Sequence, residues 1–180
     1  GVTQYKLSRK KAFVALANLT DAFGRILSEP KGRGQDQSGR MHQFVVSNHM
    51  LTSHVATLAY YSQSEAAGPG ADPTTYRPVV EEIEARLKKT TLWLKGEVAV
   101  GEDITSVAPA SAREGLRMLN DRMNGLVERR KAELDQGTME SATRRQLSVF
   151  KPIADQFNFI DKVSVNIEKL SKELAGGVKA

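Results

Sequence analysis

The chain has 180 residues, of which 40% are hydrophobic and 26% are charged, so its composition is that of a folded domain rather than of a disordered segment. The sequence contains no cysteine, which excludes disulfides, thiolate metal sites and cysteine nucleophiles and fits a reducing compartment. The net charge of +5 favours anionic surfaces but falls short of the dense basic stripe of a nucleic-acid-binding protein.

Neither a membrane span nor a signal peptide is expected within the chain. No stretch approaches the ~20 apolar residues that a span requires, and the longest, residues 13–19, is interrupted by Asn18. The basic start leads into an amphipathic segment rather than into an apolar block with a cleavage site. Gly1 resembles a cloning remnant, and a start inside a basic helical stretch indicates a domain cut from a longer protein; an unusual native start would look the same.

Two helices are predicted in the first third of the chain. Residues 3–28 carry apolar side chains at spacings of three and four, namely Phe13, Leu16, Leu19, Phe23, Ile26 and Leu27. Glu29-Pro30 ends this helix, because proline disfavours helical geometry in the preceding residue. A second helix over 38–64 carries Met41, Phe44, Val45, Leu51, Val55 and Leu58, and it stops before the glycines at 68–70.

The third predicted helix covers residues 73–97 and opens with Asp72-Pro73, a good N-cap and first-turn pair. Its apolar residues are Tyr76, Val79, Val80, Ile83, Leu87, Leu92 and Leu94. Between them, Glu81, Glu82, Glu84, Arg86, Lys88 and Lys89 place opposite charges three and four residues apart. We therefore expect these charges on a solvated face, with a break near Gly96 and Gly101.

Two more helices are predicted after this break. The fourth begins near Ser111, which with Glu114 forms a capping box, and carries Leu116, Leu119, Met123, Leu126, Val127 and Leu134. Residues 136–138 stop it, and Thr138 or Ser141 caps a fifth helix with Leu147, Phe150, Ile153, Phe157, Ile160, Val163, Ile167 and Leu170. Pro152 predicts a kink or a break near residues 149–151, and the tail after Leu174 should fray.

These elements predict an all-α fold, an antiparallel bundle of about five long amphipathic helices that forms one domain over residues 1–180. The histidines His42, His49 and His54 share the second helix, but their separations of seven and five differ from the offset of three or four that a metal pair on one helix needs. Packing or surface roles are expected for them, and no metal site.

No catalytic centre and no cofactor are predicted. The pairs Glu81-Glu82 and Glu102-Asp103 are expected on a polar helix face and in a loop, which supply neither the burial nor the closely held like-charged partner that acid-base catalysis by a carboxyl group requires. Phosphate-binding loops, nucleophile elbows and Glu-x-x-His motifs are absent from the sequence. The chain is therefore not expected to be an enzyme.

Basic clusters are the remaining candidate sites. They are Lys6 with Arg9, Lys10 and Lys11; Lys88-Lys89; Arg129-Arg130-Lys131; and Arg144-Arg145. The first cluster is the most informative, because cations beside a truncated-looking start are typical of a cytoplasmic juxtamembrane segment. A solvated helix end would show the same pattern, so both interpretations stay open.

Residues Tyr5 to Leu19 read YKLSRKKAFVALANL, and the helix that they begin closes at Ser28-Glu29-Pro30. This segment resembles the helix that follows the transmembrane block in the family of fusaric-acid-resistance-type (FUSC, YccS-like) inner-membrane proteins. Residues Val46 to His54, VSNHMLTSH, and Lys151-Pro152-Ile153 resemble its second helix and its C-terminal end. Together they cover about a third of the chain.

The resemblance implies a cytoplasmic domain, on the inner face of the bacterial inner membrane, of a protein grouped with exporters of aromatic carboxylic acids. Its partner would be the transmembrane part of the same protein, with Lys6, Arg9, Lys10 and Lys11 near the membrane, and its role would be in assembly or regulation. Contact with an anionic membrane surface and a homo-oligomer stay open, whereas nucleic acid is disfavoured. The alternative is a stand-alone helical module that docks a partner helix through an exposed apolar stripe.

Overall fold

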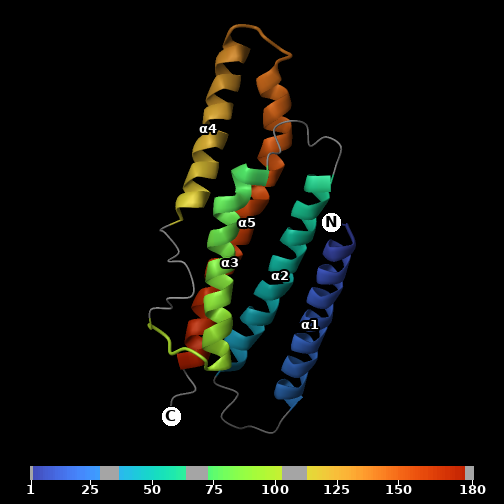
Figure 1. Ribbon diagram of the computed structural model, residues 1–180, viewed down its shortest axis with the longest axis vertical. Helices are drawn as coiled ribbons and strands as arrows, with labels where there is room; N and C mark the ends of the chain where they lie inside the picture. The colour runs from blue at the N-terminus through green and yellow to red at the C-terminus, as the bar shows by residue number, and fades with distance from the viewer. Residues whose placement is uncertain (1, 29–36, 64–72, 103–112, 177–180) are drawn as a thin grey trace. The chain divides into compact units, whose positions relative to one another are not determined.

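The computed structural model describes residues 2–28, 37–63, 73–102 and 113–176, and within them the chain forms α-helices and no strand. The helices are α1 (Val2–Ser28), α2 (Ser38–Gln63), α3 (Pro73–Lys95), α4 (Glu114–Asp135) and α5 (Ala142–Gly176), and consecutive helices alternate in direction (Figure 1). The prediction of an all-α bundle of about five long helices is therefore confirmed.

Glycines end two of the helices where the sequence predicted a stop. At the end of α3, Gly96 has φ 71°, the Gly96 N–H donates to the Trp93 carbonyl at 3.1 Å, and the Glu97 N–H donates to the Leu92 carbonyl at 3.0 Å. Gly137, with φ 77°, closes α4 with the same pair of bonds. Each is a Schellman motif, in which a residue in the left-handed region lets two orphan carbonyls find donors.

The predicted start of α4 is wrong. The helix begins at Glu114, its N-cap is Arg113 at φ 55°, and no side-chain hydrogen bond is made at that cap. Glu114 therefore cannot complete a capping box with Ser111, which lies outside the described residues. The acceptor for the first turn comes instead from another helix, as described below.

Ser141 and Pro152 decide the geometry of α5. The Arg144 N–H donates to the Ser141 Oγ at 3.0 Å, so Ser141 is the N-cap that the sequence offered beside Thr138. The helix then continues without interruption through Pro152, and the alternative of a break is wrong. Ile153 and Ala154, the next two residues, are buried, so packing holds together a helix in which proline costs ~3 kcal/mol. The helix also runs two residues past Leu174.

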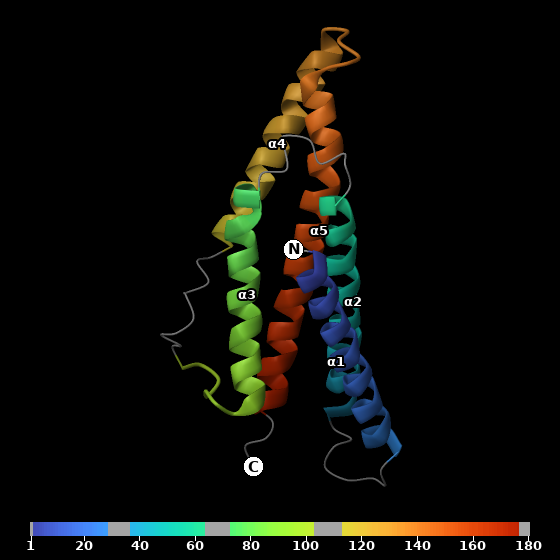
Figure 2. The same ribbon diagram turned by 45° about the vertical axis from the view of Figure 1, so that its right-hand side comes forward.

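The described helices form two compact units, each of which combines parts of four helices. The first unit comprises residues 1–53, 87–104 and 163–180 and includes α1, the first part of α2, and the ends of α3 and α5. In this unit Thr20 meets His49 and Phe23 meets His42, so α1 and α2 run antiparallel (Figure 2). Its buried apolar residues are Leu16, Val45, Trp93, Val163, Ile167 and Leu170.

The second unit comprises residues 54–86 and 105–162 and includes all of α4 with the remaining parts of α2, α3 and α5. In this unit α4 and α5 form an antiparallel hairpin (Figures 1 and 2). Asn120 and Asn158 exchange two amide hydrogen bonds across it, at 2.8 and 3.1 Å. The apolar core of this unit consists of Val79, Ile83, Leu119, Leu126, Phe150, Ile153, Ala154, Phe157 and Ile160.

Some members of the predicted apolar stripes lie in solvent. These exposed residues are Phe13, Leu27, Val55, Val80, Leu94 and Leu134. A stripe at spacings of three and four is wider than the line along which two helices touch, so its edges are covered only where a further element packs against them. The apolar pattern therefore predicted the helices better than it predicted the burial of each side chain.

Candidate functional site

The four cations predicted as the membrane-proximal site lie along the first half of α1. Lys6, Arg9, Lys10 and Lys11 are all exposed. Within the described residues none of them forms a salt bridge, although the Arg9 guanidinium lies 5.5 Å from the centre of the Phe13 ring. The helix as a whole carries Arg25 as a fifth cation and Asp21 as its one acidic residue. This surface is therefore strongly positive and is not neutralised by its own helix.

Two apolar residues lie among these cations. Leu7 is 47% exposed and Val14 is 52% exposed, seven residues apart, with Lys10 and Lys11 between them. Residues at i, i+3, i+4 and i+7 share one side of a helix. We call Leu7, Lys10, Lys11 and Val14 the outer face of α1.

The opposite side of α1 packs against α2, where two of the histidines lie. Leu16 is buried, the Thr20 Oγ1 lies 3.1 Å from the His49 Nε2, and the Phe23 ring meets the His42 ring at 5.7 Å between centroids. His42 and His49 therefore line the contact between α1 and α2, which is a packing and surface role.

His54 contacts α5 in the second unit. Its Nδ1 lies 2.9 Å from the Gln156 Oε1, and its ring stacks on Phe159 with 5.0 Å between centroids. Among the described residues, no three histidine, aspartate or glutamate side chains are grouped so that they could hold a metal ion. His54 thus belongs to a different helix contact from His42 and His49.

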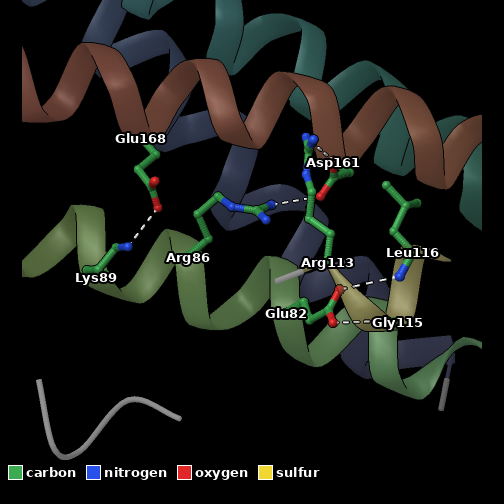
Figure 3. Close-up of polar contacts among 8 residues, drawn as sticks. All are labelled: Glu82, Arg86, Lys89, Arg113, Gly115, Leu116, Asp161 and Glu168. Carbon is green, nitrogen blue, oxygen red and sulfur yellow. Dashed lines mark hydrogen bonds and ion pairs between the residues drawn. The ribbon is translucent and has the colours of Figure 1, made fainter. Parts of the chain in front are cut away.

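Charged residues that the sequence placed in solvent are buried around the start of α4. Glu82 is only 8% exposed, and its carboxylate accepts hydrogen bonds from the Gly115 N–H at 2.6 Å and from the Leu116 N–H at 3.4 Å (Figure 3). The first N–H groups of a helix have no acceptor within the helix, and a carboxylate there also meets the positive end of the helix dipole. Glu82 of α3 thus caps α4.

Asp161 lies between two arginines in the same region. The Arg86 Nη1 donates to its Oδ1 at 2.9 Å, and the Arg113 Nη2 donates to its Oδ2 at 2.7 Å (Figure 3). Arg86 and Asp161 are 5% and 1% exposed, whereas the side chain of Arg113 is 51% exposed. We call Glu82, Arg86, Arg113 and Asp161 the charge cluster.

The charge cluster joins three helices of the second unit. Glu82 and Arg86 belong to α3, Asp161 belongs to α5, and Arg113 immediately precedes α4. Both carboxylates already accept hydrogen bonds from peptide or guanidinium N–H groups. The arrangement is therefore suited to fixing the start of α4 on α3 and α5.

Sequence reasoning missed this cluster because it assigned charged residues to the solvent by type. The prediction of a solvated face is wrong for Glu82 and Arg86 and right for Glu81 and Glu84, which are exposed. A signal was present: Glu82 and Arg86 stand three and seven residues after buried Val79, on the side of α3 that carries the core. The partners, Asp161 and the start of α4, could not be identified from spacing within one helix.

Most of the other basic clusters pair within the chain. Arg130 donates to the Thr138 carbonyl at 3.0 Å and to the Met139 carbonyl at 2.8 Å, closing the turn between α4 and α5. Lys131 pairs with Glu128, Arg144 pairs with Glu140, and Lys89 pairs with Glu168. Asp103 lies outside the described residues, while exposed Glu102 accepts a bond from the Ala99 N–H.

Glu133 is the acidic partner of that turn. Its carboxylate accepts a hydrogen bond from the Ser141 hydroxyl and lies 3.3 Å from the Arg130 Nη1. Hydrogen bonds from Ser141 and then Thr143, together with Arg130, lower the pKa of the Glu133 carboxyl below its usual 4.5. The charged form of Glu133 is therefore favoured by the folded turn.

None of the helices in the described part of the chain combines the length and apolar character that a membrane span requires. The structure thus places the predicted basic cluster together on α1 and reveals the charge cluster as a second, buried group. Comparisons of the chain with protein-family models, with curated proteins and with solved structures found no match.

Proposed function

We propose that this chain is the helical, cytoplasmic-side domain of a fusaric-acid-resistance-type inner-membrane protein, with a role in assembly or regulation of transport. The observation that carries the proposal is the exposed, uncompensated positive charge at the start of α1. Cytoplasmic segments beside membrane spans carry an excess of lysine and arginine. The resemblance of residues 5–19, 46–54 and 151–153 to that family supports it.

In this proposal α1 faces the membrane part of the protein and the rest of the domain supports it. Lys6, Arg9, Lys10 and Lys11 would meet anionic groups at the membrane, while Leu16 and Phe23 hold the other side of α1 on α2. Under this proposal the domain has a supporting role and is not expected to take part in chemistry with a substrate. The exported molecule would be an aromatic carboxylic acid, as the resemblance implies.

The test is charge reversal in the full-length gene product. Arg9→Glu, Lys10→Glu and Lys11→Glu together should lower export or assembly roughly tenfold or more, because three cations near an anionic surface are each worth about 1 kcal/mol. The chain itself should keep its helical circular dichroism, because all three side chains are exposed. Unchanged export would overturn the proposed role of α1.

A matched control makes the same change of net charge on a helix other than α1. Lys162, Lys169 and Lys172 are exposed residues of α5. Replacing all three by glutamate should leave export near that of the unaltered protein. An equal loss in both triple variants would show a general charge effect and would contradict a specific role for α1.

A second candidate is a helical protein-interaction module. The exposed apolar side chains of the second unit include Val55 and Tyr60 on α2 and Phe159 on α5. Substitution of Tyr60 and Phe159 by serine would then abolish capture of a helical partner. Under the first proposal the same substitutions leave export unchanged.

A further inference from the structure

We propose that the outer face of α1 binds an anionic lipid-headgroup surface directly. This inference rests on the proposed function and goes beyond it, because it names the molecule that meets the cations. The outer face, defined above, consists of Leu7, Lys10, Lys11 and Val14, and Lys6 and Arg9 flank it.

The first argument is the contrast between α1 and α4. Helix α4 carries five cations and five acidic residues, and several of these pair at helical spacing, such as Arg117 with Glu114 and Lys131 with Glu128. Helix α1 carries five cations and one acidic residue, and among the described residues its first four cations have no salt bridge. The complement of this surface is therefore an anionic one that belongs to another molecule.

The second argument is the position of the apolar residues. Leu7 and Val14 point to the same side of α1 as Lys10 and Lys11, opposite to the side that Leu16 buries. Lysine side chains lay their apolar stems along neighbouring apolar groups and extend their ammonium groups outward, so Leu7 and Val14 can enter the headgroup boundary while Lys10 and Lys11 reach the phosphates. A soluble acidic partner would gain nothing from leucine and valine at these positions unless it offered an apolar contact.

The third argument is the type of cation. Three of the first four cations of α1 are lysines, at positions 6, 10 and 11. Lysine is a flexible point charge, whereas arginine recognises a carboxylate or phosphate in a fixed bidentate geometry. Lysines on a convex helix suit mobile headgroups spread over a plane better than they suit one anion held at a defined place.

The proposal can be tested by measuring how much of the 180-residue chain binds to lipid vesicles. We expect the chain to co-sediment with vesicles of equal parts phosphatidylglycerol and phosphatidylcholine, and much less with phosphatidylcholine alone. Raising the salt concentration should weaken binding, because the screening length falls to ~10 Å at 0.1 M ionic strength. Equal binding to both vesicle types, or binding that is insensitive to salt, would overturn the proposal.

Two variants separate charge from apolar contact. Lys6→Glu, Lys10→Glu and Lys11→Glu together should lower the partition coefficient on the order of 100-fold, since each cation contributes roughly fivefold. Leu7→Ser with Val14→Ser, which changes no charge, should lower it roughly tenfold or more through the loss of buried apolar area. The triple lysine-to-glutamate variant at positions 162, 169 and 172 is the control and should bind nearly as the unaltered chain does.

The other occupants of this face give different results. If soluble polyglutamate binds as tightly as the vesicles do and the Leu7 and Val14 variant binds both normally, the face recognises an acidic polymer and the lipid inference fails. If the chain forms a dimer that dissociates when Lys6, Lys10 and Lys11 are replaced by glutamate, and no vesicle binding is seen, the outer face of α1 binds a second copy of the chain. As a control for folding, the urea concentration at the midpoint of unfolding should be close to that of the unaltered chain for every variant.

Failure of this inference can be told apart from failure of the proposed function. Loss of export on charge reversal without any vesicle binding would mean that α1 meets the protein part of the membrane assembly, and only the lipid inference would fall. Vesicle binding with unchanged export would support lipid contact and remove the role in transport.

Discussion

Gly115 is the described glycine with the least space around it, because the backbone of α3 lies directly against α4 at this position. A Cβ atom at this position would lie 2.5 Å from the Pro78 carbonyl carbon and 2.6 Å from the Val79 nitrogen. Those are backbone atoms, which cannot turn aside as a side chain could. The absence of a side chain at Gly115 is what allows the Glu82 carboxylate to reach the first N–H groups of α4.

Gly115→Ala should therefore destabilise the protein, whereas Gly125→Ala should stabilise it. An alanine at position 115 forces α4 away from α3, which costs ~1–3 kcal/mol. At position 125 a Cβ would meet nothing within 4 Å, so the gain of alanine over glycine in a helix, roughly 0.5–1 kcal/mol, is realised. Urea denaturation of the two variants measures this. Shifts of the same sign would contradict the close approach.

At the scale of elements, the turn between α4 and α5 combines a Schellman motif at Gly137 with a serine N-cap at Ser141. Arg130 and Glu133, on the last turns of α4, hold the two ends together. Glu133 is charged in this arrangement, and its lowered pKa means that the folded turn binds the carboxylate form more favourably than the unfolded chain does.

Glu133→Gln should lower stability at neutral pH and lose its effect in acid. Because the folded pKa lies below the usual 4.5, the stabilisation by Glu133 is fully present above that value and disappears as the pH falls through the folded pKa. Urea denaturation at about pH 7 and about pH 3 should therefore show a difference between the variant and the unaltered chain that shrinks in acid. Ser141→Ala should reduce the same pH dependence; a difference that is constant with pH would contradict it.

The helices could be predicted from the sequence because periodicity and stop signals are local properties. The ends of α3 and α4 follow from Gly96 and Gly137, because glycine by itself permits the left-handed backbone geometry found there. The start of α4 could not be predicted, since its cap is Glu82, a residue 33 positions away. The spacing within a helix already places Lys10 and Lys11 on one side with Leu7 and Val14. Only the structure shows that this side is exposed and that Leu16, on the opposite side, is buried.

At the scale of the molecule, three helices run through both compact units. Helices α2, α3 and α5 each contribute residues to the first and to the second unit, whereas α1 and α4 belong to one unit each. A continuous helix couples the residues along it, so we expect the two units to unfold in one cooperative transition.

Asp161→Asn tests this coupling, because Asp161 lies in the second unit and Trp93, the one tryptophan of the sequence, lies in the first. Removing the buried carboxylate leaves Arg86 without this partner, which should cost ~3–5 kcal/mol. The fluorescence transition of Trp93 in urea should therefore move to lower urea together with the circular dichroism. Asp155→Asn, which breaks an exposed pair with Lys151, should shift both by ~1 kcal/mol or less. Trp93 fluorescence that does not move would show units that unfold separately.

The cap that Glu82 provides also orders events during synthesis. Glu82 leaves the ribosome before Gly115, so its carboxylate is already present in the nascent chain when the first turn of α4 emerges. For Arg113 the order of synthesis is reversed, because its acceptor, Asp161, is synthesised 48 residues after it. We therefore expect the start of α4 to meet its acceptor on α3 earlier during synthesis than Arg113 meets its acceptor on α5.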